Sequence, residues 1–203
     1  MSVCGTARAV IVHNRYMFRL QFRPDAALVL LEERHAAEIY EIVDRNREYL
    51  TEWLPWVDTT HSAGDVAVFI RGSLQQFARN EGFHAAMVYN GRIRGSVGLK
   101  PVDWANRKTE IGYWLASDCQ GKGLITDACR AVIDLAFGEW NLHKIEIRVA
   151  VGNERSAAVP QRLGFTLEGT LRHAQQLRDR WLDLRIFGLL AEEWTSSRSL
   201  KDT

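Results

Sequence analysis

The feature that most constrains this chain is a short glycine-bearing loop between a predicted strand and a predicted long helix. Residues 110–115 are predicted to form a β-strand, in which successive side chains point to opposite faces. Glu110, Gly112 and Trp114 would share one face, and the residues between them the other. The loop Gln120-Gly121-Lys122-Gly123 follows, and helical periodicity then continues to about Glu139. Glycines let a ligand approach the backbone closely, and a helix N-terminus offers unpaired N–H groups to an anion. The segment is therefore a candidate phosphate-binding site, and a tight strand-to-helix turn is the alternative that uses the same glycines.

The rest of the chain predicts a mixed α/β pattern around this segment. Asn90-Gly91, a pair typical of two-residue hairpin turns, joins predicted strands 83–89 and 93–99. Helices are predicted over 34–50, from Ser62 with Asp65 as a capping box, and from Asn153 to Gly164. The remaining predicted strands are 16–22, 27–31, 145–151, 165–177 and 181–190. Because no linker or repeat divides the sequence, we expect one domain over residues 16–194, with an N-terminal extension (1–15) and a polar C-terminal tail (195–203).

Charge and cysteine content exclude several classes of protein. Lys and Arg number 26 and Asp and Glu 25, so an overall electrostatic footprint for nucleic acid or an anionic membrane is not expected. The final hairpin is locally basic, and we interpret it mostly as a solvated face, with contact with an acidic partner as the alternative. Its basic residues are Arg172, His173, Arg178, Arg180 and Arg185. Cys4, Cys119 and Cys129 form no CxxC pair and the histidines no HxxxH pair, so neither a disulfide framework nor a metal site is expected. No apolar run approaches the roughly 20 residues of a membrane span, and polar residues interrupt the N-terminal segment, so a cytoplasmic protein is expected.

The glycine loop resembles the Q/R-x-x-G-x-G/A loop of the GNAT superfamily of acyl-CoA-dependent N-acyltransferases, which holds the coenzyme A pyrophosphate. Ile125 stands at the sixth position of that pattern, where the family has Gly or Ala. This departure is familiar in the ribosomal-protein N-acetyltransferase branch, the RimL/RimJ type. The sequence resembles that branch over roughly residues 17–192, in these ordered motifs: Asn46-Arg47-Glu48-Tyr49-Leu50 with Trp53-Leu54-Pro55-Trp56-Val57-Asp58, Ile111-Gly112-Tyr113-Trp114-Leu115, Asn153-Glu154-Arg155-Ser156, and Arg162-Leu163-Gly164-Phe165 with Leu167-Glu168-Gly169.

The resemblance implies the GNAT fold, a mixed α+β arrangement with a central, mostly antiparallel sheet of about six to seven strands and about four flanking helices. It also implies that the sheet is splayed where acetyl-CoA binds, with the pantetheine in the gap and a backbone N–H near Leu115 facing the thioester oxygen. Asn153 would bind the pantetheine amides, and a turn residue is its alternative role. The implied coenzyme-binding residues are Trp114, Leu115, Gln120, Gly121, Lys122, Gly123, Leu124, Ile125, Asn153 and Ser156.

The resemblance further implies direct transfer from thioester to amine, without a covalent enzyme intermediate, so a general base is sought. Glu110 is the first candidate, because it shares a strand face with Trp114 and an apolar neighbourhood would make its carboxylate a better proton acceptor. The alternative is a solvated glutamate paired with Arg107 or Lys108. Glu168, in the family's Leu-Glu-Gly turn, is the second candidate, and an exposed turn charge is its alternative.

The departing thiolate needs a proton. Many GNAT relatives carry a Tyr five residues before the Phe of the Leu-Gly-Phe motif for this purpose, whereas this chain has Pro160 there. Ser156 is the candidate whose hydroxyl would reach the sulfur region, and capping its own helix is the alternative. Because a thiolate with a pKa of about 8.5 is a tolerable leaving group, a dedicated acid is dispensable.

Trp53 and Trp56 flank Pro55 in what is predicted to be an exposed loop. The resemblance implies that they wall the acceptor pocket, and packing against the sheet edge is the alternative. It favours a protein N-terminal α-amine, such as that of a ribosomal protein, as acceptor. The alternatives are a small amine or polyamine, a succinyl-CoA-using relative, or an acyl-CoA-binding module without turnover. A homodimer is a further option that the family suggests, whereas direct nucleic acid binding is not expected.

Overall fold

A computed structural model describes residues 18–199, so the expected extension 1–15, Cys4 and residues 200–203 lie outside the described part. The eight strands are β1 (Arg19–Arg23), β2 (Ala26–Leu30), β3 (Phe83–Tyr89), β4 (Arg92–Leu99), β5 (Lys108–Leu115), β6 (Lys144–Ala150), β7 (Thr166–Leu177) and β8 (Arg180–Leu190). The α-helices are α1 (Ala36–Arg45), α2 (Arg47–Leu50), α3 (Ala63–Ala78), α4 (Leu124–Gly138), α5 (Glu154–Arg162) and α6 (Ala191–Ser199). Three short 3-10 helices are η1 (Glu33–His35), η2 (Pro55–Thr59) and η3 (Ser117–Cys119).

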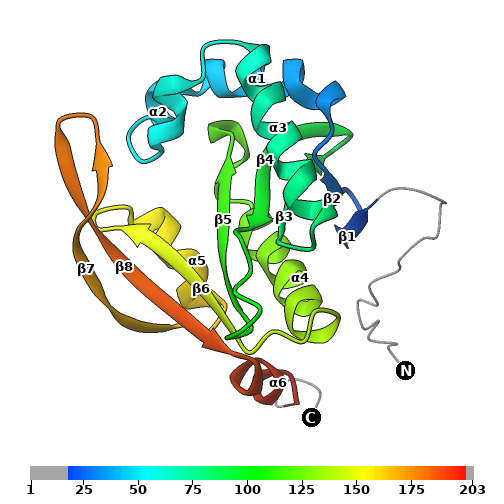
Figure 1. Cartoon of the computed structure of the whole chain (residues 1–203), viewed down its shortest axis with the longest axis vertical. Helices are drawn as coiled ribbons and strands as arrows, with labels where there is room; N and C mark the ends of the chain where they lie inside the picture. The colour runs from blue at the N-terminus through cyan, green and yellow to red at the C-terminus, as the bar shows by residue number, and fades with distance from the viewer. Residues whose placement is uncertain (1–17, 200–203) are drawn as a thin grey trace.

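The strands form one sheet in the order β1-β2-β3-β4-β5-β6-β8-β7. Every neighbouring pair is antiparallel except β5 and β6. These two parallel strands pair only at Lys108–Glu110 with Lys144–Glu146. Beyond Glu110 they separate, and Figure 1 shows β5 and β6 diverging from the end of the sheet near α6. The expected splayed, mostly antiparallel sheet is therefore confirmed, with eight strands among residues 18–199 where about six to seven were expected.

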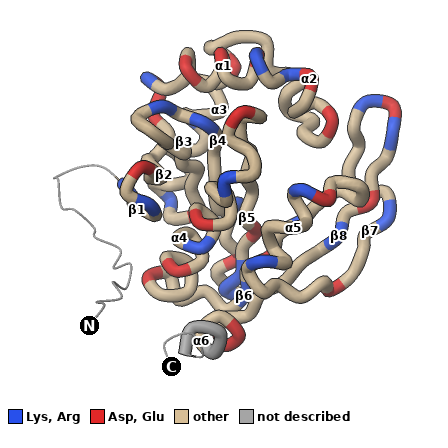
Figure 2. Tube along the Cα trace, turned by 180° about the vertical axis from the view of Figure 1, so that it is seen from behind, with Lys and Arg blue, Asp and Glu red and all other residues tan. Residues whose placement is uncertain are grey.

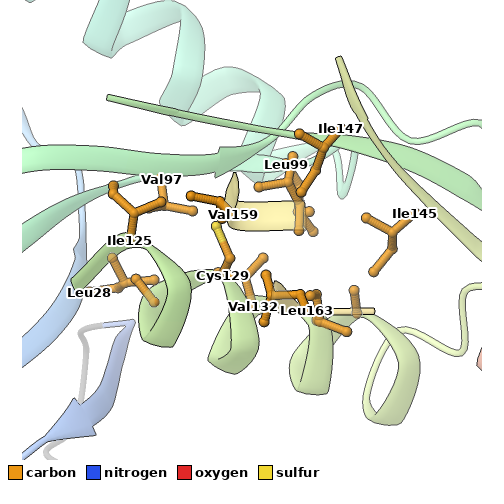
Figure 3. Close-up of a cluster of buried hydrophobic side chains, with 14 of the residues drawn as sticks. Leu28, Val97, Leu99, Ile125, Cys129, Val132, Ile145, Ile147, Val159 and Leu163 are labelled. Atoms are coloured by element: carbon orange, nitrogen blue, oxygen red, sulfur yellow. The ribbon is translucent and has the colours of Figure 1, made fainter. Parts of the chain in front are cut away.

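Helices cover both faces of the sheet and leave the diverging strands between them. On one face α4 and α5 pack on the sheet, where branched aliphatic side chains bury most of their surface, each worth about 1.5 to 3 kcal/mol. Figure 3 shows this core, with labelled side chains Leu28, Val97, Leu99, Ile125, Cys129, Val132, Ile145, Ile147, Val159 and Leu163. On the other face α1 and α3 form a second, smaller core with β3 and β4. Trp114 packs against this second core and so faces away from α4.

The single helix predicted over 34–50 is wrong, because the chain breaks at Asn46 into α1 and α2. The Asn46 side-chain amide donates to the Ile42 carbonyl at 2.8 Å. Its Oδ1 accepts hydrogen bonds from the N–H and the hydroxyl of Ser117, at 2.9 and 2.7 Å. A side chain that hydrogen-bonds backbone groups competes with helix continuation. The break turns α2 towards the loop that follows β5.

The predicted helix start at Ser62 is confirmed, since its Oγ accepts from the Asp65 N–H at 3.3 Å while the Asp65 carboxylate accepts from the His61 N–H at 3.0 Å. The predicted β3–β4 turn is also confirmed, with positive φ at Asn90 (51°) and Gly91 (74°). The strand predicted over 145–151 ends one residue earlier, at Ala150. The first strand begins at Arg19, and residues 16 and 17 lie outside the described part.

The polar C-terminal tail expected from Thr195 begins inside a helix. The backbone continues as α6 to Ser199, and the indole N–H of Trp194 donates to Asp134 of α4 at 2.7 Å. No helix among residues 18–199 combines the length and the apolar character needed to cross a membrane.

Candidate active site

A cavity of about 800 Å³ opens where β5 and β6 diverge. One side is formed by the end of β5, η3 and the first turn of α4, and the other by α5. Side chains of α2 and of the segment after it cover one end of the cavity, including Tyr49 and Trp53. This cavity is called the cleft below. Its elongated lining, with backbone on one side and a helix on the other, suits a long, narrow ligand.

The predicted phosphate-binding loop forms one end of the cleft. Gly121 and Gly123 both have a φ of 73°, in the left-handed region that favours glycine. Gly123 is the N-cap of α4, and no side chain caps that helix. The first N–H groups of α4 are therefore available to an anion, at the positive end of the helix dipole. The local backbone thus fits a pyrophosphate group, which is the anion that coenzyme A would bring.

The guanidinium of Arg23, at the end of β1, contacts this loop and the first turn of α4. It donates to the carbonyl of Lys122 at 2.9 Å and contacts the Asp127 carboxylate at 2.5 Å. Lys122 itself turns away from the cleft, with its Nζ 5.5 Å from the centre of the Tyr89 ring. Lys122 therefore remains a predicted coenzyme-binding residue through its place in the loop backbone. The other predicted coenzyme-binding residues line the cleft: Trp114, Leu115, Gln120, Gly121, Gly123, Leu124, Ile125, Asn153 and Ser156.

Ser156 does not cap α5, which corrects one of its two expected roles. The N-cap is Asn153, whose Oδ1 accepts from the Ser156 N–H at 3.1 Å. The Ser156 hydroxyl donates instead to the phenol oxygen of Tyr113 at 3.2 Å, and that phenol donates to the Ser156 carbonyl at 2.9 Å. Burial raises the pKa of Tyr113, so the phenol stays protonated and serves as a hydrogen-bond donor. Ser156 is thereby held at the cleft wall with its hydroxyl facing β5.

The Glu110 carboxylate has charged rather than apolar surroundings, which corrects the expectation for this residue. Its side chain is 15% exposed and lies 2.5 Å from Lys100 Nζ and 3.3 Å from Arg148 Nε. The alternative partners Arg107 and Lys108 are also wrong. Glu110 is the last β5 residue paired with β6, so it stands where the two strands begin to separate. It does not line the cleft itself; Trp114, four residues further along the same strand face, does.

Glu168 belongs to the same charged row and lies on β7, at the far edge of the sheet. Its carboxylate lies 2.6 Å from Lys144 Nζ, and Lys144 also contacts Glu146 at 3.6 Å. The hydrogen bond that Lys144 donates to Glu168 raises the pKa of Lys144. Glu146 continues the row to Arg148 at 3.1 Å and so to Glu110. Glu110 and Glu168 thus lie on one face of the sheet with cations between them.

Comparison with known proteins decides the family. The model of the Acetyltransferase (GNAT) domain matches residues 26–166. The Bacillus subtilis (strain 168) protein named "Putative ribosomal N-acetyltransferase YdaF" is 37% identical over 183 residues, covering 90% of this chain and 100% of that protein. This chain is a GNAT acetyltransferase.

Two further relatives of the acetyltransferase bear on its chemistry. The Escherichia coli (strain K12) ribosomal-protein-serine acetyltransferase is 27% identical over 160 residues, covering 79% of this chain and 89% of that protein. The solved structure of the microcin C7 self-immunity acetyltransferase MccE, in complex with acetyl-CoA and AMP, has a TM-score of 0.81 and 27% identity, covering 84% of this chain and 95% of that chain. The expected resemblance to ribosomal-protein acetyltransferases and the expected enzyme class are confirmed.

The two predicted acceptor tryptophans of the acetyltransferase differ in position. Trp53 lines the cleft, and its ring lies 3.5 Å from where a Cβ on Gly152 would stand. Trp56 does not line the cleft but packs on Trp114, with ring centroids 6.0 Å apart and an angle of 57° between the planes. Trp114 shares a strand face with Glu110, so Trp56 lies on the same side of the sheet as Glu110. The expected loop at Pro55 is the 3-10 helix η2.

The basic final hairpin of the acetyltransferase is not simply a solvated face. Arg178 at its tip forms a two-bonded ion pair with Asp58 of η2, at 2.7 and 2.8 Å. Arg180 donates to the Glu52 carbonyl at 2.9 Å, and Gln175 donates to the Trp53 carbonyl at 3.2 Å. These contacts are called the hairpin bridge below. They connect the β6 side of the cleft to the segment after α2, and Figure 2 shows the charged residues at the hairpin tip.

Sequence reasoning missed several groups that shape the cleft of the acetyltransferase. Arg155 of α5 donates to Gln120 Oε1 at 2.8 Å, which links the two sides of the cleft. Tyr49 lies beside them, and burial raises its pKa. Both residues stand inside motifs quoted for the family resemblance, but nothing local in the sequence shows that they converge. Tyr113 is the third, on the strand face opposite Trp114. Residues 18–199 contain no group of three or more His, Cys, Asp or Glu placed to hold a metal ion.

Proposed function

We propose that this acetyltransferase moves the acetyl group of acetyl-CoA directly to the α-amine of a protein N-terminus, with a ribosomal protein as the favoured acceptor. The observation that carries the proposal is the gap between β5 and β6, which opens beside a shielded carboxylate, Glu110. The names of the relatives support the acceptor class, since two of them are ribosomal-protein acetyltransferases by name. A cytoplasmic location is part of the proposal, because ribosomal proteins are made there.

Acetyl-CoA would bind along the cleft. Its pyrophosphate would lie on the N–H groups of the Gly121–Gly123 loop and the first turn of α4. Its pantetheine would extend between β5 and α5, where the backbone of Trp114 and Leu115 is free of β6. An N–H of this unpaired strand edge would then stabilise the oxyanion that develops on the thioester.

The acceptor amine must be neutral to attack. An α-amine has a reference pKa of about 7.7 to 8.0, whereas a lysine amine has one of about 10.4, so an α-amine needs only a modest base. Glu110 is the base that its position supports, because it lies at the point of strand separation. Glu168 lies four ion pairs further along the row, through Arg148, Glu146 and Lys144, and is the second candidate.

The thiolate leaves as the carbon–sulfur bond breaks. The Ser156 hydroxyl is the proton donor proposed for it; Tyr113 positions that hydroxyl, whose proton would turn from the phenol oxygen to the thiolate. The phenol takes no part as a base because it remains protonated. Pro160 is buried in α5 and supplies no hydroxyl, so no tyrosine at that position serves as the acid.

The test is a thiol-release assay with purified full-length protein, acetyl-CoA and a panel of acceptors. The panel contains peptides with a free N-terminus, the same peptides with a blocked N-terminus, spermidine, and a peptide whose only amine is a lysine side chain. Release that requires the free N-terminus supports the proposal. Release with spermidine alone would replace it with a polyamine acetyltransferase, for which the Escherichia coli spermidine N(1)-acetyltransferase, 33% identical over 41% of this chain, is a precedent. Running the panel with succinyl-CoA tests the donor.

A further inference from the structure

The side-chain amine of Lys100 is in direct contact with Glu110, the proposed general base. Lys100 follows β4, and its backbone N–H donates to the Glu110 carbonyl at 2.9 Å, so the two residues are neighbours across the sheet. Lys100 Nζ lies 2.5 Å from Glu110 Oε1. The Lys100 side chain is 52% exposed, whereas that of Glu110 is 15% exposed. The amine therefore has room to move while its carboxylate partner is held in place.

The Lys100 side chain leans along β5 in the direction of the cleft. A Cβ built on Gly112 would have Lys100 Cε, at 3.9 Å, as its nearest neighbour. Gly112 lies between Glu110 and Trp114 on the same strand face, and Trp114 lines the cleft. At about 3.3 Å per strand residue, Gly112 and Trp114 are about 7 Å apart along the strand. Because Gly112 has no side chain, rotation of the Lys100 side chain can carry Nζ over it to the inner end of the cleft.

We propose that Lys100 is a self-acetylation site of this enzyme. The inference rests on the proposed function, because it uses the same donor, the same cleft and the same base. The Lys100 amine contacts the Glu110 carboxylate, which is the group that the amine of an incoming acceptor must also contact. With no acceptor present, Lys100 is the amine that the fold itself presents to the bound thioester.

The reaction balances without any further reactant. The Lys100 ammonium first loses one proton to solvent. The neutral Nζ then attacks the thioester carbonyl carbon, a carbon–nitrogen bond forms, and the carbon–sulfur bond breaks. The proton released from nitrogen passes to the Glu110 carboxylate, and coenzyme A leaves as a thiol after taking up one proton. The product is acetyl-lysine, which carries no charge and cannot form the ion pair with Glu110. Arg148 then remains as the cation beside that carboxylate.

Tryptic digestion reports on this site directly. Lys100 precedes Pro101, where trypsin does not cleave, so digestion after Arg94 and Arg107 yields a peptide, residues 95–107, with Lys100 as its one lysine. The full-length protein is incubated with acetyl-CoA and no acceptor, and the acetylated fraction of this peptide is followed by mass spectrometry. Because the reaction is intramolecular, its first-order rate should not change when the protein is diluted. The native protein should react more than about tenfold faster than protein unfolded in urea.

Two variants separate enzymatic from chemical acetylation. Glu110→Gln should slow acetylation of Lys100 by about 10² or more, because it removes the base. Glu146→Gln is the matched control, because it removes the neighbouring carboxylate of the same row without touching Lys100. Lys144, which is 24% exposed and held by Glu168, is the internal reference and should remain unmodified. A good peptide acceptor should slow the labelling of Lys100, since both amines need Glu110.

The outcomes distinguish the inference from the proposed function. Acetylation of peptides with no label on Lys100 overturns the inference alone. A label that forms at the same rate in native, unfolded and Glu110→Gln protein, or at a rate that rises with protein concentration, overturns it as well. A Lys100 label without any peptide acetylation supports the inference and contradicts the proposed acceptor. Absence of both reactions overturns both.

Discussion

Tyr113 and Ser156 are joined by two hydrogen bonds across the cleft: the Tyr113 phenol donates to the Ser156 carbonyl, and the Ser156 hydroxyl donates to the phenol oxygen. Tyr113 belongs to β5 and Ser156 to α5, so the pair ties together the two sides of the cleft where β6 no longer does. The phenol is buried and the serine half-buried, so neither partner is easily replaced by water. The pair therefore sets both the width of the cleft and the direction of the Ser156 hydroxyl.

Tyr113→Phe should lower both stability and turnover. Leaving the Ser156 carbonyl without its donor costs about 1 to 3 kcal/mol of unfolding free energy, measurable by urea denaturation. If Tyr113 acts only by positioning Ser156, its effect on kcat should vanish in a Ser156→Ala background. A double-mutant cycle on kcat measures this coupling. Strictly additive effects on kcat would show that Tyr113 does not act through Ser156.

Gly123→Ala should weaken acetyl-CoA binding. A residue with a Cβ at a φ of 73° costs about 1 to 2 kcal/mol, and that Cβ would stand 3.1 Å from the Arg23 guanidinium. The loop should relax away from its phosphate-binding shape, which raises the KM for acetyl-CoA by about tenfold. Titration calorimetry with coenzyme A checks the affinity. Gly138→Ala, at the end of α4 with nothing within 4 Å of a Cβ, is the control and should leave the KM unchanged.

Glu110→Gln and Glu168→Gln distinguish the two candidate bases. Loss of a general base lowers kcat by about 10² to 10⁴, and the loss should shrink as rising pH supplies more neutral amine. We expect this pattern for Glu110 and only a small, pH-independent change for Glu168. Rate profiles from pH 6 to 10, with Glu146→Gln as the control for charge removal, make the comparison. Unchanged profiles for both glutamates would rule out a carboxylate base.

The conformation of the glycine loop before α4 could be predicted from sequence because it is local. Gly121 and Gly123 need left-handed φ values whatever the rest of the chain does, and Ser62 and Asn90-Gly91 likewise signal their own local structure. The splayed sheet, in contrast, is predicted from the family resemblance and not from local conformation. Asn46 shows the limit of local patterns, since its break of the helix depends on Ser117, 71 residues away.

The charged row could not be predicted, because its partners come from different strands. Glu110 meets Lys100 of the β4 end and Arg148 of β6, and strand register alone brings these side chains together. The nearest charges in sequence, Arg107 and Lys108, form no ion pair with Glu110. Tryptophans show the same limit: Trp104 and Trp140 pack against one another at 6.0 Å, a pairing of residues 36 positions apart. Tertiary register, rather than composition, determines both sets.

His84 should make the stability of the protein depend on pH. Burial and the nearby Lys100 charge lower the pKa of His84 from 6.5 to about 4. The unfolded chain therefore binds a proton more readily, so the stability that neutral His84 contributes is complete above pH 6.5 and is lost as the pH falls towards 4. The maximum loss is about 3 kcal/mol. Urea denaturation at pH 7 and at pH 4.5 measures it, and His84→Gln should flatten the difference between the two.

The hairpin bridge should control access of the acceptor rather than binding of the coenzyme. Asp58→Asn removes the ion pair with Arg178 and should speed amide exchange at the hairpin tip, residues 177–181, while raising the KM of the acceptor more than that of acetyl-CoA. The Arg178 guanidinium lowers the pKa of Asp58 below 3.8, so the bridge persists at neutral pH and weakens only on acidification below that value. Glu41→Gln, in an exposed α1 pair with Arg45, is the matched control and should change neither quantity. Equal increases in both KM values would mean that the bridge supports the whole cleft instead.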